Sequence, residues 1–314
     1  MAIYGSLGEV NVGALSASIS DTAVDVFVYD TRKDSDGGAW RKRTQHTSWY
    51  NETLNTATRG SRREFPAVAV IVATVDKVTI YDGDDPDLPM WMVFSSGGSR
   101  SYHYYPVAGI AGGTTFAYNG AYTNGPSSVK MINGKFLFTL SYLGDNRWSG
   151  LYRIDFISES TTLINGGGYS SGTWIRKHNI SERNTFYEPA YSISYDQNFI
   201  VNAEANDVAM TVLPNAPIDP ATGLPIPTII VGTDGNGTYL TSVISDQGTI
   251  YNIGTDGGYT CTSISIGSDN SLSMVRSDGT VYVWNDISKI SASGISPDTT
   301  LTGLLGTVSS VETT

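Results

Sequence analysis

The sequence has one cysteine, Cys261, and only 16% of its 314 residues are charged. A single cysteine excludes an internal disulfide framework and a zinc site built on cysteines. Cys261 lies in the strand-like run 259–266, where we expect a small buried side chain rather than a nucleophile. A chain without disulfides is compatible with both oxidising and reducing compartments, so the sequence does not assign the protein to one of them.

Long hydrophobic runs are also lacking. The most apolar stretch, 67–75, is far below the roughly 20 residues of a membrane span, so we expect no membrane insertion. The segment 1–5 lacks the basic start and apolar core of a secretory signal peptide. The formal net charge of −11 argues against general binding to nucleic acid.

Catalytic and metal motifs are missing as well. No nucleophile elbow, phosphate-binding glycine loop or paired metal motif occurs. The three histidines are widely spaced: His46, His103 and His178. The acidic turns 34–37 and 82–87 are better explained as ordinary turns than as calcium loops, which need about six to eight oxygen ligands. We therefore predict no catalytic residues, no metal site and no cofactor.

What the sequence does contain is glycine, tyrosine and repetition. It has 34 glycines and 19 tyrosines, and the stretch 245–252 returns as 277–285. Gly248 and Gly279 are 31 residues apart in equivalent Gly-Thr turns, each followed by a strand-like run. Such a period indicates a repeat architecture, and a repeat made of strands favours a β-propeller.

Strand-like units end at six places: 29–30, 81–82, 154–155, 211–212, 251–252 and 284–285. We therefore predict an all-β fold, a β-propeller of about six (five to seven) four-stranded blades over 1–290. The proline-rich stretch 213–228 is predicted as an insertion, and 291–314 as a closing strand or the start of a linker. The alternative is a β-sandwich followed by a small β domain, with the break at the proline-rich stretch.

Charge is uneven along the chain. Residues 32–63 hold eight basic and three acidic side chains, so they carry +5 while the remainder carries −16. This contrast predicts a basic interface for an acidic neighbour, an anionic glycan or another copy of the chain. The alternative is a set of solvated loop charges. The interface residues predicted are Arg41, Lys42, Arg43, Arg59, Arg62 and Arg63.

Aromatic residues gather in glycine-rich, loop-like sequence. Exposed aromatics stack on sugars and anchor protein contacts, which makes these side chains candidates for binding a glycan or a partner. The alternative is packing between sheets. The candidate binding residues are Trp40, Trp49, Tyr50, Tyr102, Tyr104 and Tyr105.

Several segments resemble the propeller-containing virion proteins of tailed bacteriophages, especially marine ones. They are 26–31, 40–44, 48–52, 65–70, 81–86, 212–217 and 232–235, within a similarity that spans about 8–290. The resemblance implies a non-enzymatic virion structural protein, tail-associated or an adhesion module, released by lysis. It also implies other virion proteins and further copies of the chain as partners. The alternatives are a carbohydrate-binding module for host-surface glycans and, third, a glycan hydrolase, whose paired carboxylates need no sequence signature.

Overall fold

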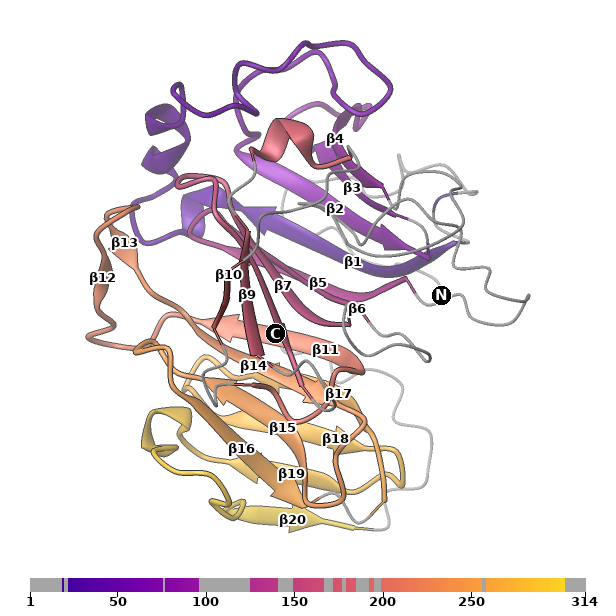
Figure 1. The fold of residues 1–314 in the computed structure, drawn as a ribbon, viewed down its shortest axis with the longest axis vertical. Coiled ribbons are helices and arrows are strands. Elements are labelled where there is room, and N and C mark those ends of the chain that lie inside the picture. The colour runs from indigo at the N-terminus through magenta and orange to yellow at the C-terminus, as the bar shows by residue number, and fades with distance from the viewer. Residues whose placement is uncertain are drawn as a thin grey trace.

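The computed structural model describes 19, 22–75, 77–95, 125–140, 149–166, 172–176, 179–184, 192–194, 199–255 and 258–302. These residues form antiparallel strands and short 3-10 segments, so the predicted all-β class is confirmed (Figure 1). The 3-10 segments are η2 (Thr31–Lys33), η3 (Ala39–Arg43), η4 (Ile180–Glu182) and η5 (Ile287–Lys289).

Four sheets carry the described fold. The first sheet is β1 (Ala23–Asp30), β2 (Val68–Thr74), β3 (Lys77–Asp82) and β4 (Met90–Ser95). The second is β5 (Pro126–Ile132), β6 (Lys135–Leu140), β7 (Gly150–Asp155), β8 (Thr161–Asn165), β9 (Gly172–Arg176) and β10 (Ser192–Ser194). The third is β11 (Ala205–Thr211), β14 (Thr228–Thr233), β15 (Tyr239–Ile244) and β16 (Ile250–Thr255). The fourth is β17 (Cys261–Ile266), β18 (Leu272–Arg276), β19 (Val281–Trp284) and β20 (Thr299–Leu301).

Turn chemistry explains the hairpins. Asn133 and Gly134, with φ of 51° and 71°, connect β5 to β6 as the predicted two-residue hairpin. Gly248 and Gly279 both have φ of 82°, which glycine adopts without steric cost. The first joins strands three and four of its sheet, whereas the second joins strands two and three. The 31-residue repeat is therefore a repeat of one hairpin type, not of a whole sheet.

The same distinction corrects the count of units. The predicted ends at 29–30 and 81–82 belong to β1 and β3 of one sheet, and those at 211–212 and 251–252 belong to β11 and β16 of another. Two strands of one sheet were thus counted as two units in each case, so six predicted units correspond to four sheets in the described part of the chain.

The proline-rich stretch 213–228 is an insertion, not a domain boundary. It leaves β11, forms the small hairpin β12 (Ile218–Asp219) and β13 (Leu224–Pro225), and returns to β14, the neighbour of β11 in one sheet. The break placed here by the sandwich alternative is therefore wrong. Leu224, 2% exposed, packs into the core between the first and second sheets.

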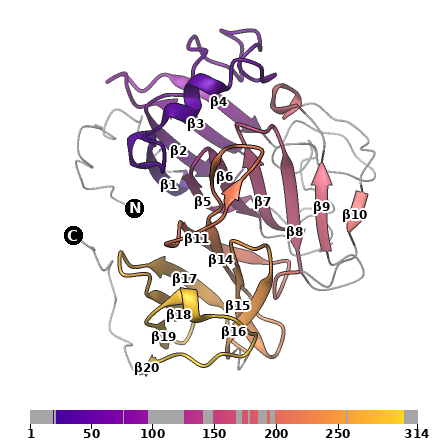
Figure 2. The same ribbon diagram turned by 90° about the vertical axis from the view of Figure 1, so that its left-hand side faces the viewer.

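The four sheets follow one another in chain order. The first strands pack in series, β1 on β5, β5 on β11, and β11 on β17, along the inside of an arc (Figure 2). One apolar core lies between each consecutive pair of sheets. Among the described elements the fourth sheet makes no extensive contact with the first, so the described sheets do not by themselves close into a ring.

A repeated β-bulge marks the start of each first strand. The extra residue is Val24 in β1, Ser127 in β5, Asn206 in β11 and Thr262 in β17. In the first three sheets the residue after the bulge contacts the next sheet, and the valine or isoleucine that follows in β5, β11 and β17 lies in the core shared with the preceding sheet. The post-bulge residues are Asp25, Ser128, Asp207 and Ser263.

These post-bulge side chains hydrogen-bond the sheets together. The Asp25 carboxylate accepts from Val129 N at 2.9 Å, one sheet further on. The Ser128 hydroxyl donates to Asp207 Oδ1 at 2.7 Å, and Asp207 Oδ2 accepts from Ile264 N at 2.8 Å. Burial raises the pKa of Asp207, against the opposing effect of these donors. Polar contacts therefore link all four sheets at equivalent places.

We expect Asp207→Ala to destabilise the protein by on the order of 2 kcal/mol, because Ile264 N and Ser128 Oγ lose their acceptor in a buried site. Denaturant unfolding measures the free-energy change. Asp87→Ala, at an exposed turn, is the matched control and should stay within about 0.5 kcal/mol of wild type. Equal effects of the two substitutions would contradict the linking role of Asp207.

Candidate functional site

Two of the predicted binding aromatics are buried. Trp40 and Trp49 are both 0% exposed, so their assignment as glycan-stacking side chains is wrong. Trp40 Nε1 donates to Asp34 Oδ2 at 2.8 Å, and Trp49 Nε1 donates to the Phe156 carbonyl at 2.8 Å. Their loops fold over the junction of the first two sheets, where the indoles fill the core. The glycine-rich sequence indicated a loop. It did not indicate whether the aromatic side chains of that loop point into the core or into solvent.

Of the four remaining aromatic candidates, the structure describes one. Tyr50 is half-buried against Trp49, and the guanidinium of Arg63 lies 5.8 Å from its ring centroid. Tyr102, Tyr104 and Tyr105 lie outside the described residues.

The predicted basic interface is largely used internally. Arg59 is 0% exposed and its assignment as an interface residue is wrong. Arg41 Nε donates to the Phe65 carbonyl at 2.8 Å, and Arg63 Nη1 donates to the Tyr50 carbonyl. Arg62 lies 2.9 Å from Asp82 and 2.6 Å from Asp84. Lys42 and Arg43 are exposed.

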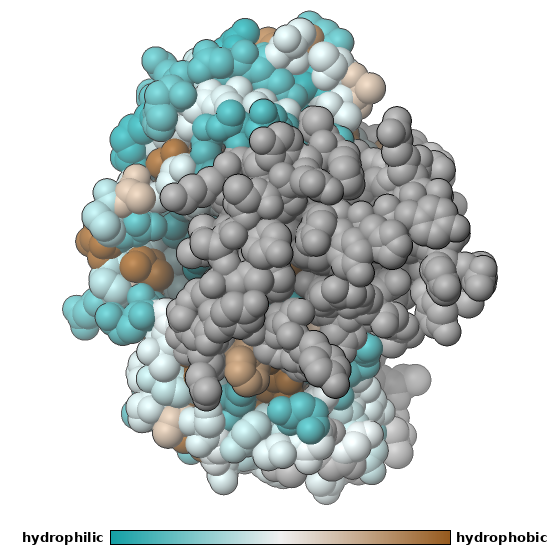
Figure 3. Space-filling view, in the orientation of Figure 1, coloured by the Kyte–Doolittle hydropathy of each residue, from teal (hydrophilic) through white to brown (hydrophobic). Residues whose placement is uncertain are grey.

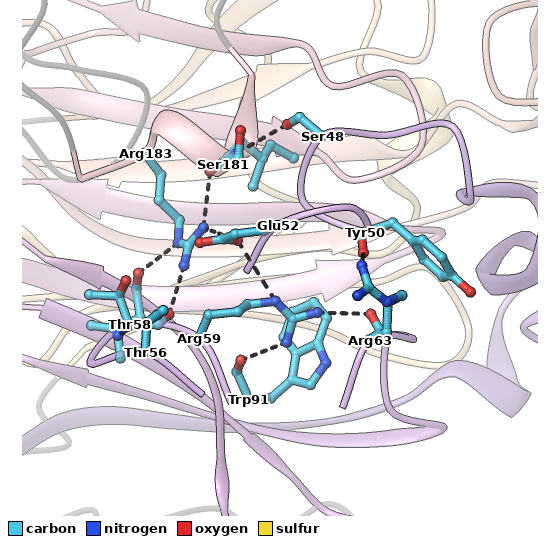
Figure 4. Close-up of polar contacts among 12 residues, drawn as sticks. Ser48, Tyr50, Glu52, Thr56, Thr58, Arg59, Arg63, Trp91, Ser181 and Arg183 are labelled. Carbon is cyan, nitrogen blue, oxygen red and sulfur yellow. Dashed lines mark hydrogen bonds and ion pairs between the residues drawn. The ribbon is translucent and has the colours of Figure 1, made fainter. Parts of the chain in front are cut away.

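Arg59 belongs to a buried cluster that the sequence did not predict. Arg183, 1% exposed, pairs with Glu52 Oε2 at 2.7 Å, and Arg59 Nε lies 3.7 Å from the same oxygen (Figure 4). Arg59 also donates to the carbonyls of Arg62, Arg63 and Trp91, with its guanidinium 4.4 Å from the Trp91 ring centroid. Desolvation lowers the pKa of Arg59 to about 10, although Glu52 opposes the shift.

The cluster ties distant segments together. Arg183 follows η4 and donates to the Thr58 and Val93 carbonyls, so one guanidinium joins the 179–184 segment to the loop before β2 and to β4. Both guanidinium groups are buried and donate to several protein oxygens, so the arrangement supports the fold.

Carboxylates of the two acidic turns are also used for hydrogen bonds within the protein. Asp34 is buried, and its carboxylate accepts from Trp40 Nε1, from Asn133 N at 2.8 Å and from the Tyr29 hydroxyl. Asp84 accepts from the Ala67 and Val68 amides in addition to Arg62. Within the described ranges, no group of three or more His, Cys, Asp or Glu side chains is placed to hold a metal ion.

Two segments that the sequence analysis singled out, the basic stretch and the proline-rich insertion, line an open hollow of about 680 Å³. Arg43 and His46, from the basic stretch, face the tip of the β12–β13 hairpin, residues 220–223. Arg43 Nη2 donates to the Thr222 carbonyl at 3.2 Å and lies 3.1 Å from Asp36. The hollow is therefore lined by a partly neutralised cation and an exposed imidazole, which suit an anionic or hydroxyl-rich ligand at the surface.

A second polar site lies beside the third sheet. Glu204 precedes β11 and Asp234 follows β14, where Asp234 N donates to the Glu204 carbonyl at 3.1 Å. Desolvation, followed by the neighbouring Asp234 carboxylate, raises the pKa of Glu204 to about 7. Asn206 Nδ2 donates to Asp234 Oδ1 at 2.7 Å, so the first residue after Ala205 in β11 is tied to the same site.

The described residues include no helix long and apolar enough to cross a membrane. Cys261 is buried, and burial raises the pKa of its thiol to about 12, in agreement with its predicted place in the core.

No family model and no curated protein matches this sequence. Among solved structures, Kluyveromyces lactis Hsv2p shares 12% identity over 70% of this chain and 71% of its own, with a TM-score of 0.25. BBS1N in complex with ARL6DN shares 10% identity over 83% of this chain and 78% of its own, with a TM-score of 0.27. Likenesses of this strength carry no argument about function.

We expect Glu52→Gln to cost about 3 kcal/mol of unfolding free energy, because it leaves two buried guanidinium groups without their shared counter-charge. Denaturant titration measures this, and Glu64→Gln, at a half-buried position, serves as the control. A loss no larger than that of the control would show that the carbonyl acceptors alone hold Arg59 and Arg183.

A pH dependence follows from Glu204. Its folded pKa, about 7, is raised above the ordinary 4.5, so its stabilising contribution is present at acid pH and is lost as the pH rises through 7. We expect the melting temperature of wild type to fall between about pH 5 and about pH 8, and the fall to shrink in Glu204→Gln. An unchanged slope in that variant, matching the control Asp246→Asn, would refute the assignment.

Proposed function

We propose that this chain is a non-enzymatic structural or adhesion module of a tailed-phage virion, built on a propeller-type series of sheets. The observation that carries the proposal is the serial linkage of the sheets through Asp25, Ser128 and Asp207. Aspartate and serine side chains form catalytic sites in many enzymes. Here these three side chains lie between sheets, where they hold the scaffold together. Its partners are other virion proteins and further copies of the chain.

Two further features support a scaffold. The buried Glu52–Arg59–Arg183 cluster pins loops of the first sheet to the 179–184 segment. Lys135, paired with Asp155 and at 2.8 Å with Asp219, pins the β12–β13 insertion to the second sheet. Rigid loops on a multi-sheet core suit a protein that presents fixed surfaces to its neighbours. The virion assignment itself rests on the sequence resemblance.

Glycan binding is the second candidate, and the hollow at Arg43 and His46 favours it. The surface there is concave, partly cationic and bordered by the Thr222 carbonyl region. Acidic sugars offer carboxylates to an arginine and hydroxyls to backbone oxygen. This site replaces Trp40 and Trp49 as the place where a glycan would bind.

Mass spectrometry of gradient-purified particles tests the virion role. The particles are taken from the lysate of a phage whose genome encodes this sequence. We expect its peptides in the particle fraction at a constant ratio to tail proteins. Recovery only in the particle-free fraction would refute the proposal.

A glycan array separates the second candidate from the first. If the hollow binds acidic glycans, Arg43→Ala should reduce the signal about tenfold or more, as expected for loss of a charge-assisted hydrogen bond. Lys33→Ala, an exposed cation away from the hollow, should leave it unchanged. Absence of any glycan signal would remove this candidate and leave the structural role untouched.

A further inference from the structure

The paired residues on the outer face of the fourth sheet include no charged side chain. Strand register places two rows of side chains across it, since alternate residues of each strand point the same way. The rows are Ser263, Val275, Val281 and Leu301, and Ser265, Ser273, Val283 and Thr299. All eight side chains are half-buried or exposed, and Leu301 is 46% exposed.

This face corresponds to the one that receives the next sheet elsewhere in the chain. Ser263 is the post-bulge residue of β17, equivalent to Asp25, Ser128 and Asp207. Those three side chains contact the following sheet, whereas Ser263 is exposed. The bulge residues behave alike, because Ser127 and Asn206 donate to the next sheet's Ala205 and Cys261 carbonyls while Thr262 is exposed and donates within its own sheet.

The composition of the face identifies what it would accept. When one face of an antiparallel sheet meets water, its outward side chains are commonly polar, but four of these eight are valine or leucine and none is charged. In Figure 3 the lower part of the molecule, where the third and fourth sheets lie, is mostly pale with some brown and teal patches, whereas the loops at the top are largely teal. Because the chain carries a net charge of −11, an uncharged face is where two copies approach with least repulsion.

We propose that a second copy of this chain packs on the outer face of β17–β20, sheet against sheet about a two-fold axis. Small serine and threonine side chains allow two flat sheets to approach to about 10 Å, and the valines and Leu301 supply the apolar contact. The inference rests on the self-assembling part of the proposed function. It moves the contact from the basic stretch 32–63 to the opposite end of the sheet series.

Light scattering of the full chain tests the proposal. We expect wild type to reach twice its 33.7 kDa mass with rising concentration, and Val283→Lys to remain at the monomer mass with an unchanged circular dichroism spectrum. Val75→Lys, at a 61% exposed position just after β2, is the matched control and should still dimerise. A monomeric wild type, or equal loss of dimer in both variants, would overturn the proposal.

Cross-linking locates the contact. Because Cys261 is buried, a thiol-specific bifunctional reagent reports only on an introduced cysteine. Ser273→Cys, in the middle of the face, should yield covalent dimer, whereas Ser61→Cys, exposed on the first sheet's loop, should not. Equal yields would overturn the face. A chain that stays monomeric yet is found in particles would refute this inference alone, and a dimer absent from particles would refute the virion role alone.

Discussion

The carboxylate of Asp207 is the contact on which the described fold depends. It accepts from Ser128 of the second sheet, from Val208 of its own strand and from Ile264 of the fourth sheet. Burial raises the pKa of the Asp207 carboxyl, and the three donors oppose part of this rise. Since Asp25 makes the equivalent contact one junction earlier, the same bulged strand start is used to attach successive sheets.

This use of polar groups shapes what the chain offers to the outside. The first three post-bulge side chains, the Glu52–Arg59–Arg183 cluster and the buried tryptophans all serve internal packing. The surface of the described residues includes a partly cationic hollow at Arg43 and an uncharged sheet face at the end of the series. Both are suited to recognition and assembly, and this links the architecture to the proposed structural role.

The sequence predicted the features that depend on neighbouring residues. The Asn133-Gly134 hairpin, the buried β2 strand and the proline-rich insertion follow from local backbone chemistry and hydrophobic runs. Features that depend on distant residues could not be predicted. The register that groups β1 with β3, the cover over Trp40, and the pairing of Glu52 with Arg183 arise only when separate segments meet. The bulge pattern itself is visible only as Ala-Val-Asp-Val and Ala-Asn-Asp-Val, too short to distinguish from chance.

Native-state hydrogen exchange at the amides of Val129 and Ile264 tests the serial linkage most directly. Both amides donate to a carboxylate of the preceding sheet rather than to a strand partner. If the sheets are joined through these contacts, both amides will exchange only through global unfolding, as slowly as amides of the buried β2 strand. Fast exchange at Val129 and Ile264, with β2 still protected, would contradict the linkage and with it the assignment of Asp25 and Asp207 as the residues that hold the sheets in series.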